Sequence, residues 1–207
     1  MTLAVRRSLA TAGASEDLTV RLQPDTVCDY GAVAVKEDAL NEWADGNQVV
    51  VTTAMMRVAE THNEPPFILA HEIAHNAQRH IDAESTNVGI GALFALIVDV
   101  AFASQGINTN GEFTRSGMNN GASANSQDFE CEADNVGMYI LARSQRPFDQ
   151  VANFWRWTAQ EVPDSIKYAS HPPASVERFV RLDQIATEIR AKAATGEDML
   201  PTTKRPP

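Results

Sequence analysis

The chain has 207 residues, of which 43% are hydrophobic and 21% charged, and this is the composition of one ordinary globular domain. A formal net charge of -10 argues against a nucleic-acid partner, because such a partner requires a basic face. Cys28 and Cys131 could pair in an oxidising compartment or remain thiols. The absence of a CxxC pair excludes a cysteine zinc site. The N-terminal segment lacks an apolar core of signal-peptide length, so we expect either a cytoplasmic protein or a targeting segment missing from this sequence.

The first third of the chain predicts a small sheet followed by helices. Residues 17–35 alternate between apolar and polar positions, as short strands do, and residues 49–53 read as a further strand that runs into a helical pattern. Two prolines in NEPP (63–66) predict a helix start, where missing N–H groups do no harm. We therefore expect an α+β fold in one domain over residues 1–195, with a disordered tail at 196–207.

A long apolar stretch covers residues 88–103 and is interrupted by Asp99. A bilayer span needs about 20 residues, so we expect a buried helix or one associated with a membrane surface. The following segment, 104–127, is rich in Gly, Asn and Ser and predicts a long mobile loop, which in a compact domain is typically a lid or disordered. Further helices are predicted over residues 126–143, 148–161 and 173–193.

The segment HEIAH (71–75) carries the chemistry of the chain. Positions i and i+4 share one helix face, so His71 and His75 can point both imidazoles at one ion. Glu72 is rotated by about 100° and can reach a water beside that ion without binding the ion itself. This HExxH pattern indicates zinc with a general base, although two hydrogen-bonded histidines and an exposed glutamate would also satisfy it.

A catalytic zinc usually takes a third protein ligand, and the segment FECEADNVG (129–137) can supply it. Glu130, Asp134 and Gly137 fall on one helical stripe, and Ala133 adds a second small residue to it. Small side chains would let this helix approach the histidine helix closely. Glu130 could then reach the metal, while Asp134 could accept a hydrogen bond from a ligand imidazole. The alternative is an acidic amphipathic helix with a small-residue packing seam.

Four motifs in this order resemble the HtpX-like and CAAX prenyl endopeptidase family of zinc metallopeptidases. They are NEWADGNQVVVTT, HEIAH followed by Arg79-His80, ExEAD with a glycine three residues on, and SHPPASVER (170–178), and they cover roughly residues 40–185. The resemblance implies a gluzincin-type site with one zinc ion per chain. It assigns the zinc ligands to His71, His75 and Glu130, the general base to Glu72, and the partner of a ligand imidazole to Asp134.

The same resemblance implies roles for two residues near the C-terminus. His171 would lie beside the open metal position and stabilise the oxyanion, and Arg178 would orient groups nearby. In the family pattern the arginine usually follows the histidine by six positions, whereas Arg178 follows by seven and Glu177 stands in the usual place. A capping histidine before a Pro-Pro turn is the alternative for His171. Residues 49–53 would form the cleft edge that pairs with an extended peptide. We expect the two remaining histidines, His62 and His80, to be structural.

These features predict a zinc-dependent endopeptidase. Zinc lowers the pKa of its bound water towards about 7, and Glu72 takes the proton as the water attacks a peptide carbonyl. We expect protein or peptide substrates, either unfolded or in the cell envelope, and by family analogy a periplasmic or envelope location. One alternative is a zinc-binding chaperone-like or scaffold protein occluded by 104–127. Another is a deformylase-type amide hydrolase, which would need Cys28 as its third ligand.

Overall fold

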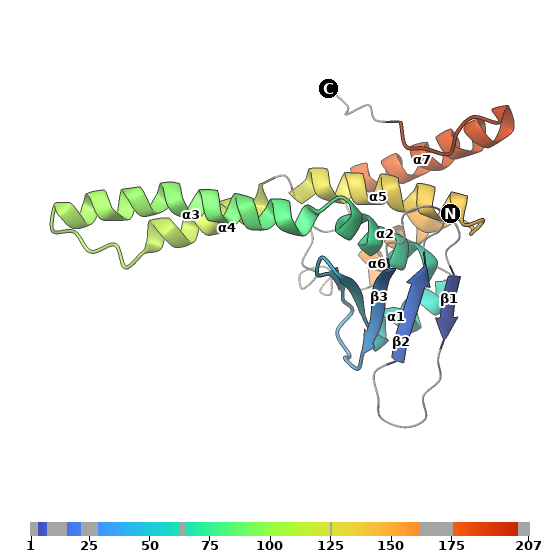
Figure 1. Ribbon diagram of the computed structural model, residues 1–207, viewed down its shortest axis with the longest axis horizontal. Helices are drawn as coiled ribbons and strands as arrows, with labels where there is room; N and C mark the ends of the chain where they lie inside the picture. Colours follow the sequence, from blue (N-terminus) through green and yellow to red (C-terminus); the bar gives the residue numbers. More distant parts are fainter. Residues whose placement is uncertain are drawn as a thin grey trace.

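The strands come first in the chain and the helices follow (Figure 1). The computed structural model describes residues 4–7, 16–21, 29–62, 65–124, 126–161 and 176–202. The strands are β1 (Ala4–Arg7), β2 (Glu16–Arg21), β3 (Asp29–Val35), β4 (Glu42–Ala44) and β5 (Gln48–Thr52). The helices are α1 (Thr53–His62), α2 (Pro65–Ala77), α3 (His80–Ser104), α4 (Glu112–Ser123), α5 (Ser126–Arg143), α6 (Val151–Glu161) and α7 (Val176–Thr195). The α+β class predicted from the sequence is confirmed.

The five strands form one mixed sheet in the order β1-β2-β3-β5-β4. Strand β5 pairs in parallel with β3 and antiparallel with β4, so Val49 lies opposite both Ala32 and Ala44. The prediction that residues 49–53 form the cleft edge is therefore wrong. The three residues of β4 cover the outer side of β5, and β4 and β1 are the two edge strands of the sheet that the structure describes.

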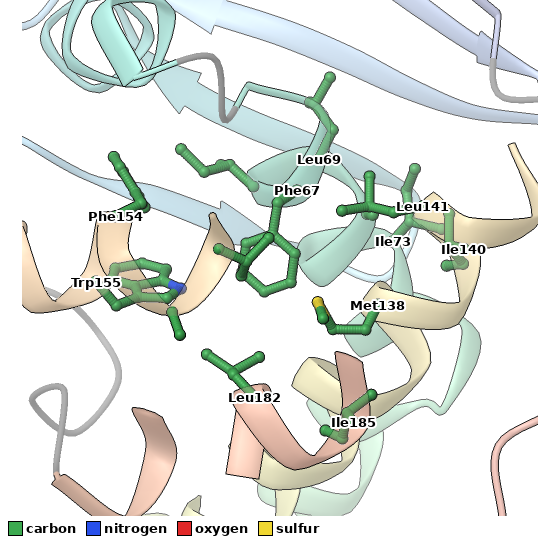
Figure 2. Close-up of a cluster of buried hydrophobic side chains, with 14 of the residues drawn as sticks. Phe67, Leu69, Ile73, Met138, Ile140, Leu141, Phe154, Trp155, Leu182 and Ile185 are labelled. Carbon is green, nitrogen blue, oxygen red and sulfur yellow. The ribbon is translucent and has the colours of Figure 1, made fainter. Parts of the chain in front are cut away.

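Helix α2 lies at the centre of the molecule, between the sheet and helix α5. Its Phe67, Leu69 and Ile73 are at most 2% exposed. Figure 2 shows Phe67 pointing at apolar residues from α5, α6 and α7, namely Met138, Trp155 and Leu182. Burying one such side chain stabilises the fold by roughly 1.5–3 kcal/mol. This packing fixes the helix that carries the HExxH motif.

Helices α3 and α4 form a hairpin that extends away from the sheet and the other helices (Figure 1). The predicted loop at 104–127 is thus wrong, because residues 112–123 are helical. Close backbone packing explains the error: a Cβ atom on Gly117 would lie 2.3 Å from the carbonyl oxygen of Gly91, and one on Gly121 would lie 2.3 Å from that of Asn87. This contact overrides the poor intrinsic helix propensity of glycine and asparagine.

The apolar stretch of α3 is mostly exposed rather than buried. Exposed side chains on this helix are Ile90, Leu93, Phe94, Leu96, Ile97, Val98, Val100 and Phe102. Asp99 is the one charged residue in this apolar stretch, and it is buried. It accepts hydrogen bonds from the hydroxyls of Thr109 and Thr114 and from the backbone N–H of Thr114. Within the described part of the chain, α3 is the single helix long and apolar enough to cross a membrane.

The C-terminal segment folds back along α7. Lys192 donates hydrogen bonds to the carbonyl oxygen of Leu200 at 2.6 Å and to the hydroxyl of Thr202 at 2.9 Å. The predicted disorder is therefore wrong for residues 196–202, because two of the three donors of the Lys192 ammonium hold this segment in place. Residues 203–207 lie outside the described residues.

Candidate metal centre

Helix α2 presents both histidines of the motif to the same point. His71, Glu72 and His75 are 3%, 1% and 3% exposed, and the Nε2 atoms of His71 and His75 are 3.2 Å apart. The apolar residues between them anchor the other faces of the helix in the core, which forces this polar edge to remain inside the protein. Buried polar groups need partners, so a second element must supply them.

Helix α5 brings Glu130 to these imidazoles. Its Oε2 atom lies 3.4 Å from Nε2 of His71, and its Oε1 atom lies 3.2 Å from Nε2 of His75. Zinc–nitrogen and zinc–oxygen bonds of about 2.0–2.2 Å in a tetrahedron place neighbouring ligand atoms roughly 3.3–3.5 Å apart. The three side chains could therefore hold one ion between them, and two imidazoles with a carboxylate are a donor set that zinc uses in catalytic sites.

Two small residues of α5 permit this approach, as the sequence predicted. A Cβ atom on Gly137 would lie 3.2 Å from both the Cα and the N atoms of His71, and Ala133 is fully buried. A larger residue at 137 would push α5 away from α2. The distance between Glu130 and the histidines therefore depends on the absent side chain.

Asp134 and Arg178 form a buried ion pair behind His71. The Oδ1 atom of Asp134 lies 3.0 Å from Nδ1 of His71. Arg178 of α7 donates two hydrogen bonds to the same carboxylate, from Nε at 2.7 Å and from Nη2 at 2.8 Å, and its guanidinium lies over the Trp155 ring. Its Nη1 atom is also 3.5 Å from Glu130. Arg178 therefore contacts Asp134, which in turn contacts His71.

Burial and charge act against each other in this site. Burial by itself lowers the pKa of His71, but Asp134 and Glu130 outweigh it and raise that pKa to about 10. Burial raises the pKa of Asp134, yet the Arg178 charge outweighs it and holds that pKa below its ordinary value. The pKa of Glu72 is raised to about 8, mainly by burial. Its Oε2 atom is buried and makes no hydrogen bond to any residue that the structure describes.

Two residues of the site were missed by the sequence analysis. His80, expected to be structural, places its Nδ1 atom 3.1 Å from Nδ1 of His75. Glu42 on β4 has a pKa raised to about 7 by burial, and the charges of His71 and Arg178 act against that shift. The Arg79-His80 pair after the motif was a usable signal for His80, whereas Glu42 in a three-residue strand carried none.

A cavity of about 420 Å³ opens beside the candidate metal ligands. Its wall includes His75 and Glu130 together with Trp43 of β4, Ile81 of α3 and Phe129 of α5. Edge strand β4, the base of the hairpin and the candidate metal ligands therefore border one space. His171 and Cys28 lie outside the described residues, so the role predicted for His171 stays a prediction.

Two buried imidazoles and a carboxylate converging on one point, with a buried glutamate next to the first imidazole, define a site of the HExxH metallopeptidase class. Comparison with known proteins agrees. A family model described as Peptidase family M48 matches residues 14–186, and the chain belongs to this family of metallopeptidases. The resemblance to HtpX-like peptidases is thereby confirmed.

The chain is also similar to curated proteins named beta-barrel assembly-enhancing protease. It is 30% identical over 168 residues to the one from Yersinia pestis, covering 77% of this chain and 33% of that protein. It is 26% identical over 147 residues to the one from Escherichia coli (strain K12), covering 67% of this chain and 29% of that protein. The chain thus spans about a third of the length of these relatives. No solved structure matches the chain.

Proposed function

We propose that the protein is a zinc-dependent endopeptidase in which His71, His75 and Glu130 hold one zinc ion. The main support for this proposal is the spacing of 3.2–3.4 Å between the candidate ligand atoms of these residues. A zinc ion held there would supply Lewis-acid chemistry, lowering the pKa of a water molecule and polarising a peptide carbonyl.

Glu72 acts as the general base in this proposal. Its Oε2 atom has no hydrogen bond within the described residues, so it is available to accept a proton from the attacking water. With a pKa near 8 the carboxyl group is mostly protonated at neutral pH, and a cation beside it favours the charged form that a base requires. Glu72 then carries the proton to the departing amine. His171 is proposed to stabilise the oxyanion.

The substrate is proposed to be an extended or unfolded polypeptide of the cell envelope. Strand β4 supports this choice, because it forms one edge of the sheet and its Trp43 and Ala44 line the cavity beside His75. An extended peptide can add to such an edge through main-chain hydrogen bonds. The relatives are named for beta-barrel assembly, which favours a periplasmic or envelope location. No specific observation favours the scaffold alternative, since the segment thought to occlude the site is mostly helix α4, packed along α3.

The test uses zinc-loaded wild type with Glu72→Gln and Glu130→Gln variants, on a quenched-fluorescent unfolded protein. Glu72→Gln is expected to keep zinc and fold but lose turnover. Glu130→Gln is expected to lose most of the bound zinc. Unchanged zinc content in Glu130→Gln would remove Glu130 from the ligand set, and full activity of Glu72→Gln would remove Glu72 as the base.

The α3–α4 hairpin is proposed to associate with a lipid surface. At 3.6 residues per turn, the exposed apolar residues from Ile90 to Val100 cover about 200° of the α3 circumference. A partner protein packed against α3 would cover a narrower arc of the helix, whereas lipid acyl chains can surround the whole apolar arc. Most exposed residues of α4 are polar, among them Asn119 and Asn120, as suits the headgroup side of an interfacial hairpin.

Flotation with phosphatidylcholine vesicles tests this association. Leu93→Glu with Ile97→Glu alters two side chains that are each 60% exposed, so the fold should be kept while flotation is lost. Val180→Glu on α7, at a residue 47% exposed, is the matched control and should still float. Equal flotation of wild type and the double variant would rule out the hairpin as the membrane contact.

A further inference from the structure

The second metal ligand, His75, has its own chain of contacts on the side away from Glu130. His80 is 4% exposed, and its Nδ1 atom lies 3.1 Å from Nδ1 of His75. The Nε2 atom of His80 lies 3.4 Å from a carboxylate oxygen of Glu132, and the His80 ring is stacked on Phe129 with ring centres 4.6 Å apart. His80 is thus held by two residues of α5, the helix that also carries Glu130.

The backbone explains how His80 returns to His75 only five residues later. Arg79 has a φ of 58°, in the left-handed region, where it separates α2 from α3. This turn changes the direction of the chain, so that the first residue of α3 faces the last turn of α2. A straight continuation of α2 would carry residue 80 along the helix axis and around to a different face.

We propose that His80 and Glu132 form a relay that fixes the tautomer and orientation of His75 as a zinc ligand. The inference rests on the proposed metal site. When Nε2 of His75 faces the metal, its Nδ1 carries the hydrogen and donates it. Nδ1 of His80 must then accept, so the hydrogen of His80 sits on Nε2 and points at Glu132. One consistent set of tautomers satisfies all three residues.

The relay is the counterpart of the Asp134–Arg178 pair behind His71. Each ligand imidazole then has a partner at the ring nitrogen away from the metal: a carboxylate at 3.0 Å for His71 and a second imidazole at 3.1 Å for His75. Such partners orient ligand rings and raise their basicity, and their loss typically lowers metal affinity about 10- to 100-fold. His80 is therefore a positioning residue that does not itself bind the ion.

Two substitutions at position 80 separate this role from simple packing. His80→Phe keeps a ring that stacks on Phe129 but has no acceptor for His75. His80→Asn is smaller, but its side-chain oxygen lies near the position of Nδ1 and can accept the hydrogen bond. Zinc affinity, measured by competition with a chromophoric chelator, should fall about 10- to 100-fold in His80→Phe. It should remain within a few-fold of wild type in His80→Asn, with thermal unfolding of the zinc-free proteins as the check on folding.

Nitrogen-15 NMR of the histidine rings in zinc-loaded wild type gives a second readout that needs no variant. We expect His80 with its hydrogen on Nε2 and His75 with its hydrogen on Nδ1. The opposite tautomer of His80, or equal zinc affinity of a folded His80→Phe protein, would overturn the relay. Wild type that binds no zinc would instead overturn the proposed function, so the two failures are distinguishable.

Discussion

Replacing Arg178 by methionine would test the ion pair behind His71. Methionine keeps apolar contact with Trp155 but leaves the Asp134 carboxylate, 2% exposed, without its guanidinium. Removing one member of a buried pair costs about 3–5 kcal/mol. The Asp134 carboxylate can avoid being buried as a charge by taking up a proton. Raising its pKa from about 3.9 to 7 lowers the free energy of unfolding at neutral pH by about 4 kcal/mol. His71 remains nearby as a second cation, so we expect a loss of about 3 kcal/mol at pH 7.

The sign of the pH dependence follows from the same pair. In wild type the pKa of Asp134 is lowered, so its contribution to stability is present above about pH 4 and is lost as pH falls through the folded value. In Arg178→Met burial raises that pKa, so stability is lost as pH rises. The difference between the two proteins should therefore shrink to about 1.5 kcal/mol or less at pH 5.

The assay is urea unfolding of the zinc-free proteins at pH 7 and pH 5, followed by tryptophan fluorescence. The double variant Arg178→Met with Asp134→Asn is the control, because it leaves no buried carboxylate and should regain most of the lost stability. A loss below about 1 kcal/mol at pH 7, or one that does not change between the two pH values, would refute the reasoning.

Three further predictions concern particular contacts. Gly137→Ala should weaken zinc binding with the fold retained, because its methyl group would lie 3.2 Å from His71 backbone atoms and push Glu130 away; unchanged affinity in a metal titration would contradict this. Zinc affinity should fall as pH is lowered below 10, because the proton on His71, whose pKa is about 10, competes with the ion; isothermal titration in buffers of different ionisation enthalpy should show proton release on binding. Gly117→Val should open the hairpin while leaving the core folded, since a Cβ there would meet Gly91 at 2.3 Å; hydrogen exchange should then be faster in α4 and unchanged in α2.

The sequence could predict those site residues that lie one helical turn apart on the same helix. His71 and His75 lie one turn apart on α2, and Glu130 and Asp134 lie one turn apart on α5. Gly137 marked the face on which the two helices meet. Each of these follows from a local period, and the close packing of α2 against α5 then brings the two faces together.

The rest depended on contacts between distant segments. Helix α4 has a sequence of poor helix formers, and it is helical because Gly117 and Gly121 fit against α3. Strand β4 has only three residues, too few to show an alternating pattern, yet it displaces β5 from the sheet edge. The contact of His80 with His75 depends on one left-handed residue, Arg79, which no periodicity predicts.

The α3–α4 hairpin leaves the fold and returns to it at nearly the same place. The side-chain amide of Asn87 donates a hydrogen bond to the carbonyl oxygen of Ala124 across its base. Everything beyond that bond forms an insertion whose two ends are already close together. An insertion of this kind can be shortened, lengthened or exchanged without altering the path of α2 or α5. The proposed lipid contact of the hairpin can therefore change while the candidate metal site on α2 and α5 stays the same.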